Sequence, residues 1–354
     1  MRRLRIALIA SARFPIREPF AGGLEAHTWA LARGLKRRGH DVTVFAGAGC
    51  DPELGVHEFS AARPRISDAA RADVSMPPQA WLDEHHAYLQ LLLDLADRGH
   101  ADFDVVHNNS LHHLPIAMAR MVPVPMISTL HTPPTPWLES AVQAAPCPVI
   151  FTAVSKHTSR AWGHLIPAAQ VIRNGVDLGR WHPGPGGGPA VWMGRLVPEK
   201  GPELAIKAAR QAGWPLDLVG PIADPGYYAS QVEPLLGGDV RYRGHLTHDE
   251  IAVMLGRASV CLVTPRWDEP YCLVAAEALA CGTPVCGFTR GALPELLDDR
   301  CAVLVEPDDV GALSAGLLTA ARLPRAAARA HAAARCSQDQ MIAQYEALYR
   351  EVAA

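Results

Sequence analysis

Short apolar runs alternate with segments of helical periodicity along most of the chain, and this alternation restricts the fold more than any other feature. Apolar runs bounded by polar or glycine-containing turns are typical of buried strands. Parallel strands need crossover connections, so the pattern predicts an α/β architecture with parallel sheets. The predicted strands are residues 4–10, 42–46, 103–107, 125–130, 149–154 and 170–172, followed by 191–194, 216–219, 240–243, 258–263, 285–288 and 302–305.

The segments between these strands have helical spacing and helix-end signals. The predicted helices follow Gly22-Gly23 as far as Arg38, cover 79–98, 114–121, 136–144 and 155–164, begin again at 202, 247 and 271, and run from 308 to the end. Thr247 and Glu250 have the spacing of a capping box. Residues 47–78 are rich in Pro, Gly, Arg and Asp, and we expect an irregular segment there on the acceptor side of the molecule.

Length and composition indicate a globular protein with about two domains, because 354 residues are many for a single core. Hydrophobic residues make up 49%, and the net charge of −3 gives no reason to expect a nucleic-acid partner. The eight cysteines include no CxxC pair, which favours a reducing cytoplasm. No apolar run reaches the ~20 residues of a membrane span or the pattern of a signal peptide. We therefore expect a soluble, cytoplasmic protein.

The stretch TPRWDEPYCLVAAEALACGTP, residues 264–284, combines a strand end, an acidic turn and a helix. Pro270 suits a first helical turn, so the helix is predicted to begin near Tyr271. Glu277 lies eight residues after Glu269, about two turns of ~3.6 residues, so both carboxylates can face one polyhydroxylated ligand. Alternatively, Glu269 is only an acid favoured by the helix dipole and Glu277 a solvated position. The apolar neighbours of Glu277 instead indicate burial, and a buried carboxylate needs partners.

This E-x7-E element, with its EP start and EALACGTPV continuation, resembles the retaining nucleotide-sugar glycosyltransferases of family GT4. The resemblance implies the GT-B fold: two Rossmann-like, doubly wound domains that face a central cleft. It implies transfer of a hexose from a nucleotide sugar to a hydroxyl of a small-molecule, lipid or saccharide acceptor. UDP-glucose is the first choice of donor, then UDP-N-acetylglucosamine, then GDP-mannose. No metal or other cofactor is implied, because cations and helix dipoles would neutralise the departing diphosphate.

The resemblance also implies roles for individual residues outside the acidic element. Gly22 and Gly23 would face the donor phosphates, although a GG pair alone indicates only a tight turn. His131 would contact the donor sugar, although one histidine among 16 is more often structural. Arg195 and Lys200, in the GRLxxxKG pattern, would bind the diphosphate; otherwise they are solvated loop charges. We therefore expect His131, Arg195, Lys200 and Glu269 as catalytic residues.

Within the acidic element, Glu269 would hold the sugar and Glu277 the ribose, with Pro270, Tyr271, Cys272 and Leu273 as further donor contacts. Cys272 and Ala292 stand where the family often has glycine, which leaves the sugar hydroxyl read at these positions open. His107 and Asn108, at the end of a predicted strand, are weaker candidates for acceptor contacts.

The expected division is a first domain of residues 1–174 with the final helix 337–354, a linker of 175–189, and a nucleotide-sugar domain of 190–336. The glycine cluster at 184–188 follows no strand, so we interpret it as linker and not as a dinucleotide fingerprint. Two other functions remain open: a nucleotide-sugar 2-epimerase of the same fold and a non-catalytic nucleotide-sugar-binding protein. A Rossmann dehydrogenase is not favoured, because no strand leads into GxGxxG.

Overall fold

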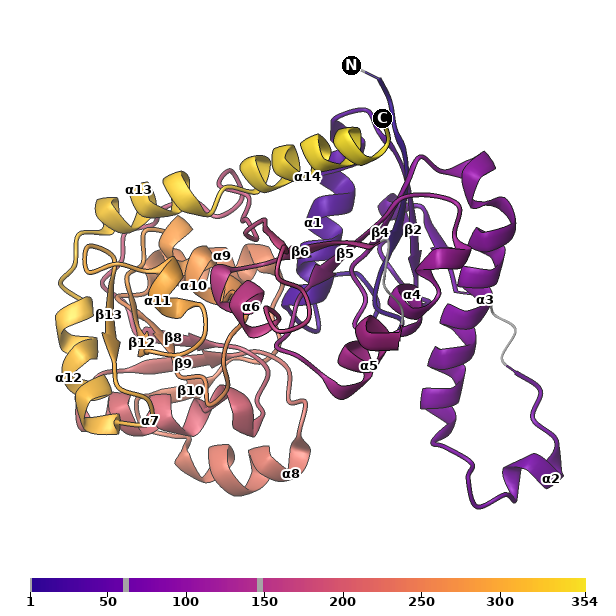
Figure 1. The fold of residues 1–354 in the computed structure, drawn as a ribbon. Coiled ribbons are helices and arrows are strands. Elements are labelled where there is room, and N and C mark those ends of the chain that lie inside the picture. Colours follow the sequence, from indigo (N-terminus) through magenta and orange to yellow (C-terminus); the bar gives the residue numbers. More distant parts are fainter. Residues whose placement is uncertain (1, 60–63, 145–148) are drawn as a thin grey trace.

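The computed structural model describes residues 2–59, 64–144 and 149–354. They form two α/β halves, each built on one parallel sheet (Figure 1). The first sheet has the strand order β3-β2-β1-β4-β5-β6-β7. Its strands are β1 (Arg5–Ile9), β2 (Asp41–Ala46), β3 (Val56–Glu58), β4 (Val105–Asn108), β5 (Met126–Leu130), β6 (Val149–Ala153) and β7 (Gln170–Val171). All its neighbouring strands pair in parallel, as the alternating pattern predicts.

The second sheet has the order β10-β9-β8-β11-β12-β13, again with parallel pairs. Its strands are β8 (Ala190–Met193), β9 (Leu216–Val219), β10 (Val240–Tyr242), β11 (Cys261–Val263), β12 (Val285–Phe288) and β13 (Ala302–Val305). In each sheet the strand order reverses once, between β1 and β4 and between β8 and β11. A crevice at the carboxyl ends of such strands is where open α/β sheets bind ligands.

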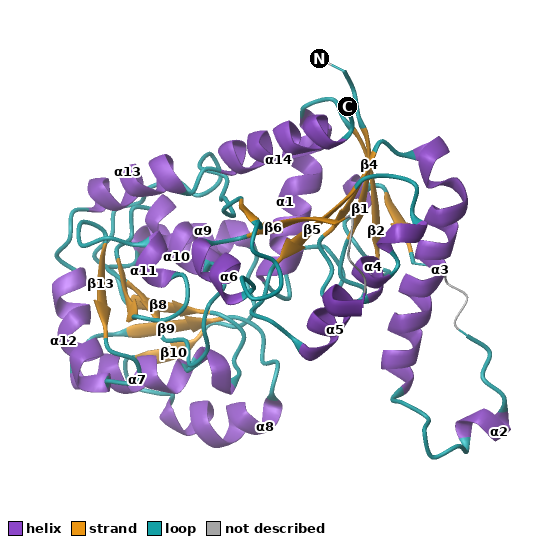
Figure 2. Cartoon of the chain, in the orientation of Figure 1, coloured by secondary structure: helices purple, strands orange, loops and turns teal. Residues whose placement is uncertain are grey.

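Helices cover both faces of each sheet (Figure 2). Those of the first half are α1 (Gly23–Arg37), α2 (Asp68–Arg71), α3 (Gln79–Asp102), α4 (Leu114–Ala117), α5 (Pro136–Ala144) and α6 (Lys156–Ala161). Those that follow are α7 (Pro202–Gln211), α8 (Pro225–Tyr227), α9 (His248–Arg257), α10 (Leu273–Ala280), α11 (Leu293–Leu296), α12 (Val310–Ala320), α13 (Arg325–Arg335) and α14 (Gln338–Val352). Shorter turns lie at Pro52–Leu54, Ala119–Met121, Pro198–Lys200, Tyr228–Val232 and Glu233–Leu235. None of the described helices combines the length and apolar character needed to cross a bilayer.

The last helix, α14, returns to the first half, so the two chain ends lie near each other (Figure 1). Tyr345 and Tyr349 are fully buried in the same apolar cluster as β1 and α1. An added Cβ at Gly34 of α1 would come within 2.0 Å of Ile342 Cδ1, so the glycine lets the two helices approach closely.

Residues 184–188 are held against the second half by backbone contacts. The N–H groups of Gly186 and Gly188 donate to Gly256 O and Arg257 O at 3.0 and 2.8 Å. A Cβ at Gly184 would lie 2.4 Å from Gly256 O, which explains a glycine there. The predicted linker is therefore a fixed connection along the end of α9 and not a free tether.

Several predicted boundaries are wrong. Within 47–78 the structure adds an edge strand, β3, and the short helix α2. The predicted strand 258–263 shortens to Cys261–Val263, and the predicted helix 114–121 divides into α4 and a 3₁₀ turn. Helix α10 begins at Leu273 and not near Tyr271, because Cys272 has φ 77° and a left-handed residue cannot continue a right-handed helix.

Candidate functional site

A cavity of about 430 Å³ lies between the two halves, at the carboxyl ends of both sheets. It contains all of the predicted catalytic and donor-binding residues: Gly22, Gly23, His131, Arg195, Lys200, Glu269, Pro270, Tyr271, Cys272, Leu273 and Glu277. The first three come from the first half of the chain and the others from the second. Residues that the family resemblance assigns to one site are thus far apart in the chain but adjacent in the fold.

Glu269 is held in place from several directions. Its carboxylate forms an ion pair with Lys200 and accepts a hydrogen bond from Trp267 Nε1 at 3.0 Å. Its backbone oxygen accepts from the N–H of Ala292 at 2.8 Å. Gly291 lies so close that an added Cβ would be 2.3 Å from both Glu269 N and Glu269 O. Ala292 is 1% exposed, and its N–H is bonded to the backbone of Glu269. The loop that carries Gly291 and Ala292 therefore fixes the backbone from which the Glu269 carboxylate extends.

Glu277 is buried in the second turn of α10 and lines the same cavity. In the described part of the chain its carboxylate has no hydrogen-bond or ion-pair partner. Burial raises the pKa of Glu277 to about 8, with Arg180 acting in the opposite direction. A ligand that offers hydroxyl groups would supply the missing partners.

Cys272 precedes α10 in the left-handed conformation, with φ 77° and ψ 73°. This conformation favours glycine, so the geometry explains why glycine is common at this place in the family that the sequence resembles. Burial raises the pKa of the Cys272 thiol to about 12. The thiol is therefore protonated at neutral pH and is a packing group, not a nucleophile.

Arg195 precedes the turn Pro198–Lys200, and Lys200 is its last residue. The turn leads into α7. The Arg195 side chain is 40% exposed, and its one hydrogen bond or ion pair among the described residues is a long contact to Glu199 at 3.4 Å, so it can turn toward a ligand. Gly201 has φ 59°, and a Cβ there would lie 2.5 Å from Thr264 O. This close approach brings the cationic turn against the end of β11.

The GG turn faces the acidic element across the cavity. A Cβ on Gly23 would lie 3.2 Å from Leu273 Cδ1, a side chain of the other half. The next acidic residue, Glu25, is 5% exposed and also lines the cavity. Burial raises its pKa, while its own backbone N–H and Arg195 lower it. Glu25 was not predicted from the sequence. The signal that could have found it is an acidic residue in the first helical turn after Gly22-Gly23.

His131 follows β5 and hydrogen-bonds through Nε2 to Asn109 Oδ1 at 2.7 Å. Burial, then the His27 and His107 rings, hold the pKa of His131 well below its usual range. The imidazole that faces the cavity is thus neutral at physiological pH. Its partner Asn109 was not predicted; it lies two residues after the predicted strand 103–107 and directly after β4.

The structure does not support His107 and Asn108 as acceptor contacts. Both are fully buried at the end of β4 and do not line the cavity. His107 lies 2.5 Å from Tyr349 Oη and 2.7 Å from Thr129 Oγ1, and Asn108 donates to Ser128 Oγ at 2.9 Å. His107 thus connects α14 to the first sheet, and Asn108 joins β4 to β5. A strand-end position alone does not distinguish these structural roles from ligand binding.

Comparisons with known proteins cover most of the chain. Residues 21–180 match the family described as Glycosyltransferase Family 4, and residues 189–336 match Glycosyl transferases group 1. The chain is 31% identical to the glycogen synthase of Mycobacterium tuberculosis (strain CDC 1551 / Oshkosh) over 361 residues, covering 89% of this chain and 86% of the relative. It is 27% identical to the D-inositol 3-phosphate glycosyltransferase of Mycobacterium avium (strain 104), covering 98% and 95%.

Solved structures match the whole fold. Sucrose-phosphate synthase from Thermosynechococcus elongatus superposes with a TM-score of 0.77 at 22% identity, covering 99% of each chain. Anabaena Alr3699/HepE in complex with UDP and glucose superposes with a TM-score of 0.76 at 18% identity, covering 98% of this chain and 99% of that one. At these identities the likeness concerns the arrangement of the two halves.

Proposed function

Because the chain belongs to the family 4, group 1 glycosyltransferases and has their GT-B fold, we propose that it transfers a hexose from a nucleoside diphosphate sugar to an acceptor hydroxyl with retention of anomeric configuration. One observation carries the proposal: two cations, Arg195 and Lys200, line the same cavity as the buried carboxylates Glu269 and Glu277. Cations suit the diphosphate, and buried carboxylates suit hydroxyl groups.

Different residues contact different parts of the donor. Glu277 accepts hydrogen bonds from the ribose hydroxyls, and Glu269 accepts them from the sugar. Lys200, already paired with Glu269, reaches the diphosphate together with Arg195. The Gly22-Gly23 turn allows close approach of the donor, and neutral His131 contacts the sugar near the anomeric centre.

In the reaction, the bond between the anomeric carbon and the diphosphate oxygen breaks, and its electron pair stays on the diphosphate. The acceptor oxygen bonds to the anomeric carbon on the same face, and its proton passes to the leaving phosphate. Arg195 and Lys200 stabilise the negative charge that grows on the phosphate oxygens. We propose that this pair takes the place of a divalent ion at the diphosphate.

UDP-glucose is the proposed donor, ahead of UDP-N-acetylglucosamine and GDP-mannose. Support comes from the similar fold of Anabaena Alr3699/HepE, whose structure was solved in complex with UDP-glucose. The names of the relatives include both a glycogen synthase and a D-inositol 3-phosphate glycosyltransferase, so acceptors of both kinds belong in a first screen.

The test is release of nucleoside diphosphate from UDP-glucose with and without an acceptor panel of glucan oligosaccharides, inositol phosphates and lipid-linked sugars. We expect release that depends on acceptor, and an α-linked product by NMR. Thermal shift with UDP, GDP and ADP identifies the base, because a bound ligand raises the melting temperature. Stabilisation by GDP or ADP but not UDP would contradict the donor, and epimerised donor formed without acceptor would contradict transfer.

A further inference from the structure

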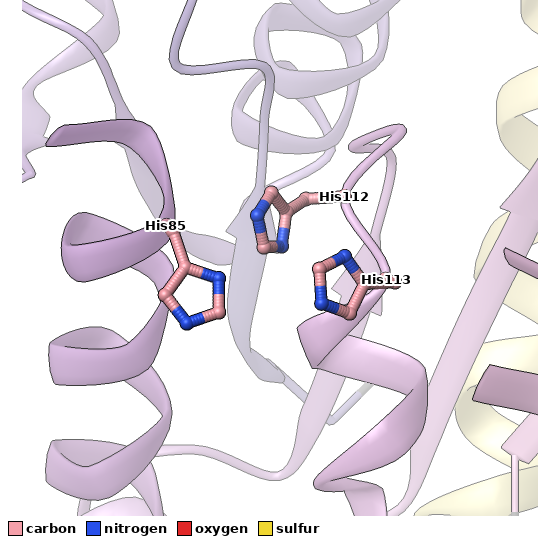
Figure 3. A group of neighbouring side chains, drawn as sticks. All are labelled: His85, His112 and His113. Atoms are coloured by element: carbon pink, nitrogen blue, oxygen red, sulfur yellow. The ribbon is translucent and has the colours of Figure 1, made fainter. Parts of the chain in front are cut away.

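Three histidine side chains gather in the first half of the chain, outside the donor residues. His85 lies on α3, and His112 and His113 lie on the loop between β4 and α4 (Figure 3). One potential ligand atom from each residue lies within 4.8 Å of those from the other two. The His112 and His113 rings are stacked with centroids 4.4 Å apart, and the His85 ring is 5.7 Å from His112 and 5.8 Å from His113.

The imidazoles have lone pairs available for coordination. His85 Nδ1 is buried and has no hydrogen-bond partner among residues 2–59, 64–144 and 149–354. His112 Nδ1 accepts a hydrogen bond of 3.2 Å from the N–H of Leu114, which fixes this nitrogen as the unprotonated one. A metal bound there would have to displace only this long, local bond.

The surroundings suit a cation held by nitrogen ligands. Trp81 stacks on His85 and Trp137 stacks on His113, so an indole ring lies against each of these two imidazoles. Glu84 lies on α3 directly before His85. Glu84 also pairs with Arg13 at 2.9 Å, so it moderates the charge of the site and is not itself free to bind strongly.

A second group of potential ligands, Asp298, Cys301 and His331, lacks these properties. His331 Nε2 lies 2.7 Å from Leu296 O, and His331 Nδ1 lies 3.2 Å from Asp298. Asp298 also pairs with Arg300 at 2.6 Å. Both ring nitrogens and the carboxylate are therefore engaged in structural contacts.

We propose that His85, His112 and His113 bind a divalent cation of the zinc type. Neutral imidazole is a preferred ligand of Zn²⁺, and three protein nitrogens with one remaining position form a tetrahedral site. The bound ion links α3 to the loop 109–113. That loop carries Asn109, which holds His131, and Leu111, which lines the donor cavity. The site is thus a positioning element beside the cavity and is separate from the diphosphate residues.

The experiment measures zinc affinity of the full-length chain, without a histidine tag and after treatment with chelator, by competition with a chromophoric chelator. We expect one tight Zn²⁺ per chain. His85→Ala and His113→Ala remove ligands that are only partly buried, and each should weaken binding by more than about tenfold, the lower end of the loss from outer-shell changes. His100→Ala, an exposed histidine on the same helix, is the matched control and should leave affinity unchanged.

Circular dichroism confirms that each variant is folded before its affinity is compared. Equal zinc affinity of the unaltered chain and both ligand variants would overturn the proposal. Substitution with Co²⁺ in the unaltered chain is an independent readout that needs no variant. The intense visible bands of a tetrahedral nitrogen site support the proposal, and the weak spectrum of hydrated octahedral Co²⁺ contradicts it.

Discussion

At the scale of single residues, the two buried glutamates should fail in different ways. Glu277 makes contacts to the ribose that change little during the reaction, whereas Glu269 faces the sugar on which charge develops. Glu277→Gln should mainly raise the donor KM, and Glu269→Gln should mainly lower kcat. Steady-state kinetics with Glu233→Gln, an exposed glutamate, as control give the comparison. Identical profiles for the two variants would refute the division of roles.

Glu277 also predicts a pH dependence of stability in the ligand-free protein. Its folded pKa of about 8 lies above the ordinary value of 4.5, so the folded state keeps a proton that the unfolded state loses. Its contribution is fully present below pH 4.5, is lost as the pH rises toward about 8, and changes no further above that. Melting temperature measured across this range should fall more steeply for the unaltered chain than for Glu277→Gln; parallel curves would show that Glu277 is already ionised.

The gathering of residues in one cavity was predictable where a motif names the residue type and spacing, whereas their roles stay predictions. Arg195, Lys200, Glu269 and Glu277 lie together because their spacing places each at a strand end or in a helix turn. Glu25 was missed because an acid in a first helical turn is ordinary, and only the three-dimensional structure shows that it is buried. His107 was misassigned because its partner Tyr349 is 242 residues away.

At the scale of elements, the loop after β12 is predicted to control Glu269 through its backbone. Gly291 has φ 58°, and a Cβ there would lie 2.3 Å from Glu269 N and O. Gly291→Ala should therefore lower both stability and turnover. Gly213→Ala is the matched control, since Gly213 has φ 62° but no atom within 4 Å of an added Cβ. The control carries only the strain of the left-handed backbone, roughly 1–2 kcal/mol.

Thermal melts and turnover of both variants give the answer. If Gly291→Ala lowers stability and turnover no more than Gly213→Ala does, the loop does not position Glu269.

The existence and order of the helices and strands were predictable from periodicity, but the start of α10 was not. Pro270 suggested an early start, whereas the left-handed Cys272, set by packing at the cavity, delays the helix by two residues relative to Tyr271.

At the scale of the whole molecule, α14 should stabilise the pairing of the two halves. Gly34→Ala places a methyl group where Ile342 Cδ1 now lies, 2.0 Å from the added Cβ. Overpacking of this kind costs roughly 1–3 kcal/mol. Ile342→Ala removes the obstructing atoms, so the double variant should be more stable than the sum of the single effects predicts.

Denaturant unfolding of the four proteins measures this coupling. Strict additivity of the two stability changes would show that α14 does not press on α1 at this position.

The return of α14 to the first half was implied by family resemblance and not by periodicity, because amphipathicity identifies a buried face but not what covers it. The fixed connection at 184–188 was likewise invisible in the sequence, since glycines signal flexibility and close approach equally well.

Under the proposed function, Arg195 and Lys200 act on the departing diphosphate. Ground-state binding also uses helix N-termini and backbone amides, so Arg195→Ala and Lys200→Ala should still bind UDP. Turnover should fall by about 10²-fold to 10³-fold, roughly 2.7 to 4 kcal/mol, because charge on the leaving group grows in the transition state. Lys207→Ala and Arg210→Ala, exposed cations on the neighbouring α7, are the controls.

The decisive measurement is calorimetry of UDP binding beside steady-state kinetics for these four variants. The structure predicts retained UDP binding with a large loss of kcat for Arg195→Ala and Lys200→Ala, and near-normal values for Lys207→Ala and Arg210→Ala. Near-normal kcat in either Arg195→Ala or Lys200→Ala would show that the altered residue does not act on the diphosphate, and would contradict the assignment of this cavity as the donor site.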